Sequence, residues 1–403
     1  VNTCCFIGDA KEESVNTILE MAEYKKTGSC KVLVVTGCMA QRYKNEIIEE
    51  VPEVDAVLGT TSYGDILKAI REAMEGKHFQ EFKDIDYLPE KLGKRVLTTG
   101  GHFGYLKIAE GCDKHCTYCI IPKLRGKFRS VPMERLVTQA KEMAEEGVKE
   151  LILVAQETTV YGTDIYGKKS LHILLKELCK IKGIRWIRVL YCYPEEIYDE
   201  LIQTIKEEKK ICHYLDLPIQ HASDRILKRM GRRTTQAELV EIVNKLRREI
   251  PDIVLRTTLI SGFPGETQED HEELMSFVDE MEFDRLGVFT YSPEEDTPAA
   301  TMPDQVAEEV KEARRDEIME LQQEISYDKG TDRIGQELLV MIEGKVADES
   351  AYIGRTYGDA PKVDGYIFVQ TGELLMTGDF AKVRVTGALE YDLIGELADE
   401  YTE

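Results

Sequence analysis

The chain has 403 residues, which at about 150 residues per domain predicts two or three domains. It carries 75 acidic and 52 basic residues, a net charge of −23, whereas phosphate backbones attract basic surfaces. Direct nucleic-acid binding is therefore not expected; the acidity suits a basic partner, although it also serves solubility alone. No apolar run reaches the ~18 residues of a membrane span and no secretory signal opens the chain, which predicts a cytoplasmic protein without membrane contact.

All ten cysteines lie within the first 212 residues. A disulfide-stapled secreted domain would be short and dense in cysteine, and this chain is neither. Clustered thiols in a cytosolic chain are more often metal ligands or catalytic groups. We therefore expect the thiol chemistry in the first half of the chain.

The N-terminal segment alternates between helix and strand patterns. The expected helices are residues 11–26, 41–50 and 63–74, and the expected strands are residues 31–36 and 54–58. Residues 1–3 look like the end of a further strand, so we expect that residues are missing upstream. Repeated strand–helix units predict a parallel α/β sheet domain over residues 1–76, followed by a weakly patterned linker over residues 77–103.

The same alternation resumes over a longer span, which we expect to form one domain over residues 104–300. The expected strands are residues 105–109, 151–155, 186–190, 214–217, 254–260 and 285–291, with helices at 134–146, 171–181 and 236–249. Six such units predict a partial (β/α)6 barrel, a fold that places its chemistry in the loops after the strands.

The C-terminal part changes character. A charged helix, residues 305–329, is expected within a connecting segment over residues 301–332. Beyond it, β-type runs at residues 338–342 and 382–385 between regularly spaced glycines predict a small antiparallel β-barrel over residues 333–403. This module has fourteen acidic and six basic residues, a net charge of −8.

The strongest chemical signal is a C-x3-C-x2-C run formed by Cys112, Cys116 and Cys119, just after an expected strand. Three thiolates can hold three irons of a cubane cluster and leave the fourth iron open to a small molecule. The alternative is a zinc site, which would need four closed ligands and would have to take His115 from inside the tight loop.

This spacing, with Tyr118 before the third cysteine, resembles the radical S-adenosylmethionine (SAM) superfamily. The resemblance implies that the open iron binds SAM and that an electron from the cluster cleaves the sulfonium to a 5′-deoxyadenosyl radical. Polar or glycine-rich segments after successive strands fit SAM binding. The residues expected to contact SAM are Tyr118, Gln156, Glu157, Gln220, Gly262, Pro264 and Gly265.

Each of these segments is weak evidence alone. The glycines of residues 262–265 would let the backbone approach a flat ligand, but the segment could also be only a turn. Thr267 and Asp270 could start the next helix as a capping box. His221 by itself is more typical of a hydrogen-bonded core histidine, and the basic run 125–129 is either a solvated loop or an anion site.

Two further cysteines indicate which family within this superfamily the sequence resembles. Cys4 and Cys38 end neighbouring expected strands, which would bring both thiols to one edge of the sheet. With the Cys112 motif and the terminal β-module, this resembles the methylthiotransferases over essentially the whole chain. Their N-terminal domain supplies three cysteines to a second cluster, and their C-terminal domain is a TRAM barrel.

One cysteine of that second cluster is not in this sequence. The family's first N-terminal cysteine lies upstream of the position matching Cys4, so assembly of the second cluster depends on residues that precede this sequence. Cys5 or Cys30 could be imagined as a substitute, but neither ends a comparable strand.

Segments such as residues 1–4, 120–126 and 217–223 resemble the RimO branch of the methylthiotransferases in particular. The resemblance implies a transferase that places a methylthio group on the β-carbon of an aspartate in small-subunit ribosomal protein twelve. It implies two 4Fe–4S clusters, SAM, and a reductant such as flavodoxin or ferredoxin. A MiaB-type tRNA methylthiotransferase is the nearest alternative, disfavoured by the acidic terminal module; a non-catalytic iron–sulfur scaffold is the other.

Overall fold

The computed structural model describes residues 1–89, 96–347 and 349–402. The chain folds as two compact units, each built from separated segments. The first unit combines residues 1–96, 110–129 and 292–302, and the second combines residues 97–109, 130–291 and 303–403. The expected domain boundaries treated the chain as consecutive segments and stay a prediction.

The first unit contains a four-stranded sheet in the order β1-β2-β3-β4, and all of its pairs are parallel. Its elements are β1 (Asn2–Thr3), α1 (Gly8–Thr27), β2 (Val34–Gly37), α2 (Cys38–Tyr43), α3 (Glu46–Glu50), β3 (Ala56–Leu58), η1 (Tyr63–Asp65), α4 (Ile66–Met74), β4 (Phe79–Glu81), α5 (Ile121–Arg125) and η3 (Pro298–Thr301). Ile18, Val35, Val54 and Val57 are among the buried side chains that join α1 to the sheet. The expected parallel α/β sheet is confirmed.

Two details of this unit differ from expectation. The helix expected over residues 41–50 is two short helices, because Lys44 adopts a left-handed φ of 46° between them. The segment expected as a linker contains the strand β4, which pairs with β3; residues 90–95 of that segment lie outside the described residues.

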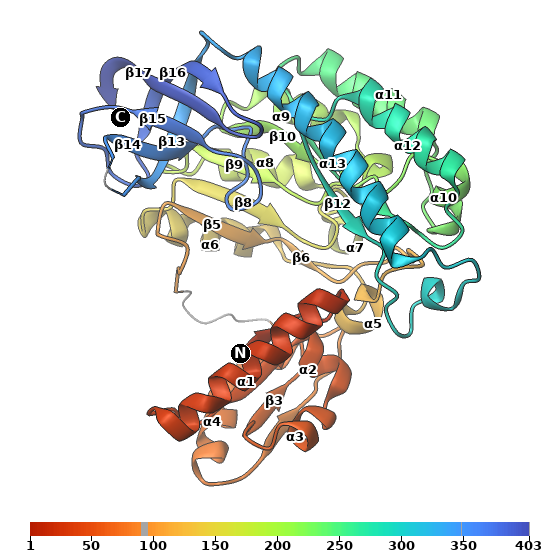
Figure 1. The fold of residues 1–403 in the computed structure, drawn as a ribbon. Helices are drawn as coiled ribbons and strands as arrows, with labels where there is room; N and C mark the ends of the chain where they lie inside the picture. The colour runs from red at the N-terminus through yellow and green to blue at the C-terminus, as the bar shows by residue number, and fades with distance from the viewer. Residues whose placement is uncertain (90–95, 348, 403) are drawn as a thin grey trace. The chain divides into compact units, whose positions relative to one another are not determined.

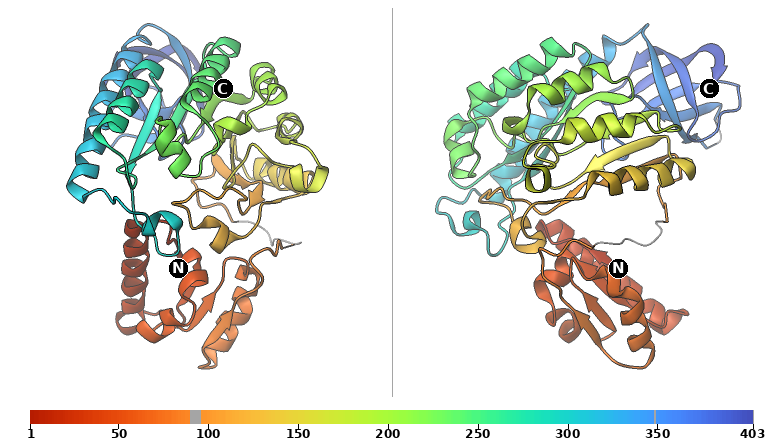
Figure 2. Two further views of the ribbon diagram at one scale, coloured as in Figure 1. Left: turned by 90° about the vertical axis from the view of Figure 1, so that its right-hand side faces the viewer. Right: turned by 180° about the vertical axis from the view of Figure 1, so that it is seen from behind.

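The second unit contains a six-stranded parallel sheet in the order β12-β11-β10-β9-β8-β5, curved like part of a barrel (Figures 1 and 2). Its strands are β5 (Phe103–Lys107), β8 (Glu150–Val154), β9 (Trp186–Val189), β10 (Ile211–Asp216), β11 (Val254–Ser261) and β12 (Arg285–Thr290). A separate two-stranded sheet pairs β6 (Ala109–Glu110) with β7 (Arg129–Ser130). The expected six-strand partial barrel is confirmed.

Helices cover the outer face of this sheet (Figure 1). The helical elements of this unit are α6 (Met133–Glu145), α7 (Thr163–Tyr166), α8 (Leu171–Cys179), η2 (Pro194–Glu196), α9 (Asp199–Glu207), α10 (Asp224–Arg229), α11 (Gln236–Glu249), α12 (Gln268–Met281) and α13 (Glu308–Thr331). Thr267 and Asp270 form the expected capping box at the start of α12, and Thr235 forms another with Glu238 on α11.

The C-terminal module is a closed five-stranded barrel in the order β13-β14-β15-β17-β16. Its strands are β13 (Glu337–Lys345), β14 (Ala351–Arg355), β15 (Ile367–Gln370), β16 (Phe380–Ala388) and β17 (Leu393–Thr402). The expected barrel is confirmed, with the difference that β15 and β17 pair in parallel.

The barrel and the six-stranded sheet share one hydrophobic core. Met341, Ala360 and Phe380 of the barrel pack with Trp186 and Tyr214 of the sheet, and the rings of Trp186 and Phe380 meet edge to face at 4.9 Å. The terminal module is therefore packed against the sheet by burial of apolar surface.

Buried charges reinforce this contact. The Glu150 carboxylate accepts hydrogen bonds from Arg188 Nε at 2.8 Å and from Arg355 Nη2 at 2.7 Å, and all three side chains are fully buried. Arg355 on β14 also pairs with Glu343, and Arg285 on β12 pairs with Asp359. Burial alone would raise the pKa of Glu150, but the two guanidiniums outweigh it and hold that pKa below its usual value.

Candidate functional site

The three motif cysteines lie in a single loop of the first unit, between β6 and α5. Cys112 and Cys116 are buried, and Cys119 is partly buried. Backbone contacts shape the loop: the Cys112 amide donates to the Gly126 carbonyl at 3.1 Å, and the Cys119 amide donates to the Cys116 carbonyl at 3.0 Å. The Phe128 amide donates to the Asp113 carboxylate at 3.0 Å, which closes the loop from the other side.

The donor set of this loop fits an iron–sulfur cluster. Burial, reinforced by the neighbouring thiols of Cys116 and Cys112, raises the pKa of Cys119 to about 12. Three cysteine thiols in one loop match the thiolate ligand set of a cubane cluster, whose iron charge would hold them as thiolates. Among the described residues no three His, Cys, Asp or Glu side chains stand in a metal-binding arrangement.

The two N-terminal cysteines lie where the strand pattern placed them. In the parallel pair β1–β2, Thr3 is opposite Gly37, so Cys4 and Cys38 follow the two strands at equivalent positions. Cys4 is exposed and Cys38 is buried. Gly37 has a φ of +103°, and a Cβ there would come within 2.4 Å of the Thr3 carbonyl oxygen, so the turn before Cys38 requires glycine.

The sequence named Arg125 only as the start of a basic run and did not predict that it contacts the Cys38 thiol. It lies on α5, directly after the Cys112 motif, and its Nε donates to Cys38 Sγ at 3.2 Å while Nη1 lies 3.6 Å from Glu110. Burial raises the pKa of the Cys38 thiol, and the Arg125 guanidinium opposes that rise. Whether the basic run binds an anion stays a prediction.

Cys5 and Cys30, the possible substitutes for the upstream cysteine of the second cluster, differ in position. Cys5 is fully buried in a cluster with Cys38, Ile120 and Leu124, and burial with the nearby Cys38 thiol raises its pKa to about 11. Cys30 precedes β2, at the opposite end of that strand from Cys38. Cys5 is thus the nearer of the two to Cys38.

The second unit places the other expected residues after successive strands of its sheet. Gln156 and Glu157 follow β8, and the Glu157 carboxylate accepts the Thr159 amide at 2.9 Å. Gln220 follows β10 with a left-handed φ of 72° and bridges to β11, its amide bonding to the Thr258 carbonyl at 2.9 Å. Gly262, Pro264 and Gly265 follow β11. Three strand ends of one sheet therefore carry six of the seven residues expected to contact SAM, while Tyr118 lies in the cysteine loop between β6 and α5; SAM contact stays a prediction for all seven.

The strand-end cysteine Cys192 is a packing residue. Its side chain is fully buried and lies 3.4 Å from Thr158 Oγ1, and burial raises its pKa to about 12. His221 is likewise buried and accepts the Ser223 amide at Nδ1, as expected for a core histidine.

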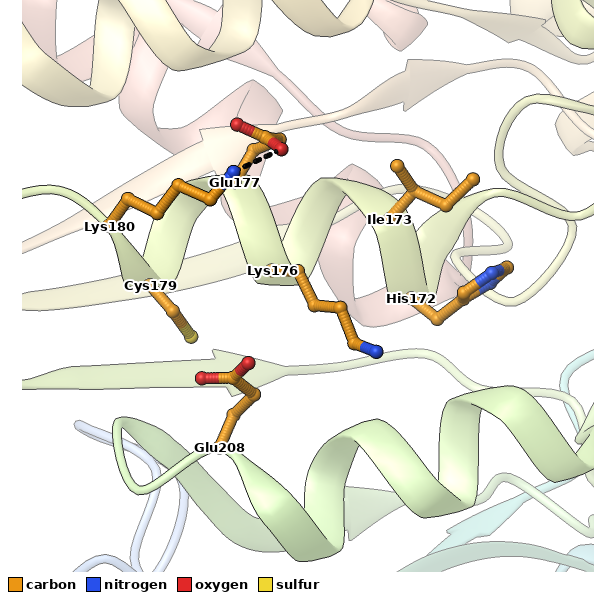
Figure 3. A pocket seen from close by; sticks show the side chains of 7 residues that line it. All are labelled: His172, Ile173, Lys176, Glu177, Cys179, Lys180 and Glu208. Carbon is orange, nitrogen blue, oxygen red and sulfur yellow. Dashed lines mark hydrogen bonds and ion pairs between the residues drawn. The ribbon is translucent and has the colours of Figure 1, made fainter.

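A surface hollow of about 520 Å³ lies elsewhere, on the outer face of the second unit (Figure 3). It is lined by His172, Ile173, Lys176, Glu177, Cys179, Lys180 and Glu208. No expected site residue lines it, and burial raises the pKa of its Cys179 thiol to about 12, which keeps that thiol unreactive.

Of the helices that the structure describes, none is both long and apolar enough to cross a membrane.

Family models match three parts of the chain. Residues 106–278 match the radical SAM superfamily, residues 334–398 match the TRAM domain, and residues 1–59 match the uncharacterized protein family UPF0004. The first match contains the Cys112 motif and all three strand ends described above, and it implies a 4Fe–4S cluster and SAM.

Curated relatives match almost the full length. The ribosomal protein uS12 methylthiotransferase RimO of Lachnoclostridium phytofermentans is 66% identical over 98% of this chain and 90% of its own length. The RimO proteins of Clostridium perfringens and Clostridioides difficile are 54% and 50% identical, each over 99% of this chain and 89–90% of their own lengths.

A solved structure shares the fold. The radical SAM methyltransferase TsrM of Kitasatospora setae, solved with cobalamin and a 4Fe–4S cluster, gives a TM-score of 0.53 at 14% identity, covering 70% of this chain and 61% of its own. At that identity only the fold is shared. On the strength of its near-full-length relatives, the chain belongs to the RimO family of radical SAM methylthiotransferases.

Proposed function

We propose that this enzyme adds a methylthio group to the β-carbon of an aspartate in ribosomal protein uS12. The observation that carries the proposal is the 66% identity to a curated uS12 methylthiotransferase over 98% of the chain. The net charge of −23 supports a basic protein substrate over a tRNA, because ribosomal proteins must neutralise RNA.

Cys112, Cys116 and Cys119 would hold the radical-generating cluster. When bound, the cluster and SAM supply the radical chemistry of the family. The protein's share is to supply the three sulfurs from one loop, in which Cys112 and Cys116 are buried, and to leave the remaining iron free of protein ligands. Tyr118, Gln156, Glu157, Gln220, Gly262, Pro264 and Gly265 would contact SAM.

Cys4 and Cys38 would hold a second cluster together with a cysteine upstream of residue 1. Their equivalent places after β1 and β2 and the Arg125 hydrogen bond to Cys38 support this. Counting iron tests it: a chain with the upstream cysteine should hold about eight irons, and its Cys38→Ala variant about four. The present chain should hold about four, and a stable eight would make Cys5 the first suspect for the third ligand.

A flavodoxin or ferredoxin is the class of reductant that such clusters would need.

The deciding experiment is mass spectrometry of uS12 from cells with and without the gene. The modified aspartate peptide should lose the methylthio mass when the gene is deleted and regain it on complementation. Complementation with the Cys116→Ala variant should fail. An unmodified uS12 in the parent cells, with a methylthiolated tRNA lost on deletion, would instead support the MiaB-type alternative.

A further inference from the structure

The loop after β11, residues 262–267, is held by its neighbours at nearly every backbone polar group. From α10, Arg229 Nε donates to the Pro264 carbonyl at 3.0 Å and Arg225 Nη2 donates to the Gly265 carbonyl at 2.8 Å. The Gly265 amide donates to the Asp304 carbonyl at 2.7 Å. The loop is therefore fixed before any ligand arrives.

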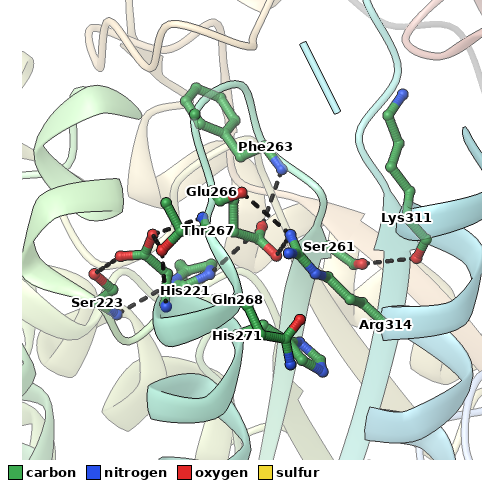
Figure 4. Close-up of polar contacts among 12 residues, drawn as sticks. His221, Ser223, Ser261, Phe263, Glu266, Thr267, Gln268, His271, Lys311 and Arg314 are labelled. Carbon is green, nitrogen blue, oxygen red and sulfur yellow. Dashed lines mark hydrogen bonds and ion pairs between the residues drawn. The ribbon is translucent and has the colours of Figure 1, made fainter. Parts of the chain in front are cut away.

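The carboxylate of Glu266 is the centre of this arrangement (Figure 4). It is fully shielded from solvent and accepts the Phe263 amide at 3.0 Å and Arg314 Nη1 at 2.9 Å. Because Nδ1 of His221 accepts an amide, its Nε2 carries the proton, and that atom lies 3.6 Å from the same carboxylate. Burial would raise the pKa of Glu266, but His221, Arg314 and the Phe263 amide together lower it.

Helix α13 supplies the other side of the loop. Besides the carboxylate, Arg314 Nη1 reaches the Glu266 carbonyl at 3.3 Å, and Ser261 Oγ donates to the Lys311 carbonyl at 2.8 Å. The Lys311 side chain lies against Gly262, whose φ is +70°; a Cβ there would come within 2.2 Å of Lys311 Cγ. The glycine thus lets the Lys311 side chain of α13 lie close against the loop.

We propose that Arg314, acting through Glu266, is a positioning residue that holds the 262–267 loop in its SAM-binding shape. The inference rests on the proposed function only in that this loop contacts SAM. A buried carboxylate is tolerated when it is paired, so without the guanidinium Glu266 must take up water or a proton, and the Phe263 amide loses its fixed acceptor. A loop that must first be ordered binds its ligand more weakly.

The test uses Arg314→Met and, as a matched control on the same helix, Arg315→Met, because Arg315 is more exposed and pairs with its neighbour Asp316. Without SAM, hydrogen exchange at the Phe263 amide should be about tenfold faster or more in Arg314→Met and unchanged in the control. In the cluster-loaded enzyme, the Kd for SAM should rise by a similar factor, while the cleavage rate at saturating SAM stays within about twofold. Arg314→Lys should restore part of the affinity.

The outcomes separate the inference from the proposed function. If the parent enzyme neither binds nor cleaves SAM, the proposed function fails. If the parent binds SAM but Arg314→Met shows unchanged exchange and unchanged Kd, or only a lower cleavage rate from less folded enzyme, the positioning role is wrong. Should Arg314→Met not fold, Glu266→Met replaces it, since it removes both the partner of Arg314 and the acceptor of the Phe263 amide; an unchanged Kd there would equally overturn the inference.

Discussion

Substitution of single cysteines should distinguish the thiols that bind the cluster from those outside the expected site. Cys116→Ala should abolish reductive cleavage of SAM to 5′-deoxyadenosine and the binding of about four irons, because two thiolates cannot hold the cluster. Cys179→Ala is the control: that thiol sits on α8, outside the expected site, and should leave both quantities unchanged. Full cleavage activity in Cys116→Ala, measured anaerobically after reconstitution, would show that the cluster lies elsewhere.

Arg125 acts on a thiol that lies 87 residues away in sequence. Burial raises the pKa of Cys38 and Arg125 opposes it, so Arg125→Met should raise that pKa further. Since a hydrogen bond to a charged group is worth ~1.5 kcal/mol, alkylation of Cys38 by iodoacetamide at fixed pH should slow about tenfold in the cluster-free protein. Lys123→Met on the same helix should not change the rate; equal slowing there would assign the effect to α5 as a whole.

Among the elements, those with a long periodic pattern were predicted and the short ones were not. The helix α11 and the Thr267–Asp270 capping box follow from local sequence alone. The strand β4 has three residues and no apolar run, so only its pairing with β3 makes it a strand. Likewise, the parallel β15–β17 pair depends on barrel closure, which no local pattern encodes.

The site residues likewise divide into those that the sequence predicts and those that it does not. The spacing of Cys112, Cys116 and Cys119 and the strand-end places of Cys4 and Cys38 are readable because chain order alone fixes them. Arg125 and Arg314 are not, since each meets its partner, Cys38 or Glu266, only through the fold. Basic residues on helices are usually solvated, and nothing nearby in sequence marks Arg314 as buried or pairs Arg125 with Cys38.

The buried ion pair between Glu150 on β8 and Arg355 on β14 joins the terminal barrel to the six-stranded sheet. Arg355→Met should lower the free energy of unfolding by ~3–5 kcal/mol, because it leaves Glu150 buried with half of its compensation. Arg384→Met, which removes an exposed pair with Glu337 in the same barrel, should cost ~0–1 kcal/mol. Urea unfolding of the two variants measures the difference, and equal values would mean that Glu150 is accommodated without Arg355.

The buried ion pairs around this contact also make the stability of the protein depend on pH. The pKa values of Glu150, Glu343 and Asp359 are lowered in the folded protein: burial opposes this in each case, and arginines or His102 outweigh it. The unfolded state then binds more protons as the pH falls, so their contribution is complete above pH ~4.5 and is lost below it. Asp364, whose pKa burial raises, acts in the opposite direction. We expect lower stability at pH 4 than at pH 7 and a smaller difference in Arg355→Met; an undiminished difference would exclude Glu150 as its source.

At the scale of the whole molecule, charge selects the partner. The terminal module carries −8 of the net −23, so a basic ribosomal protein should be attracted and a tRNA repelled. Exposed charges are screened beyond ~8 Å at physiological salt, and association with uS12 should therefore slow as salt rises.

Charge reversal on the terminal module tests this directly. Glu349, Glu373 and Glu390 are exposed and suit replacement by Lys, whereas Asp379 accepts the Met376 amide at 2.8 Å and should be kept. The triple variant should associate with uS12 about tenfold more slowly at low salt and cleave SAM at the parent rate, because charges at the surface steer encounter without touching the cluster loop. An unchanged association rate would mean that the acidic surface serves solubility alone. Tighter binding of the parent enzyme to tRNA than to uS12 at matched salt would contradict the protein substrate itself.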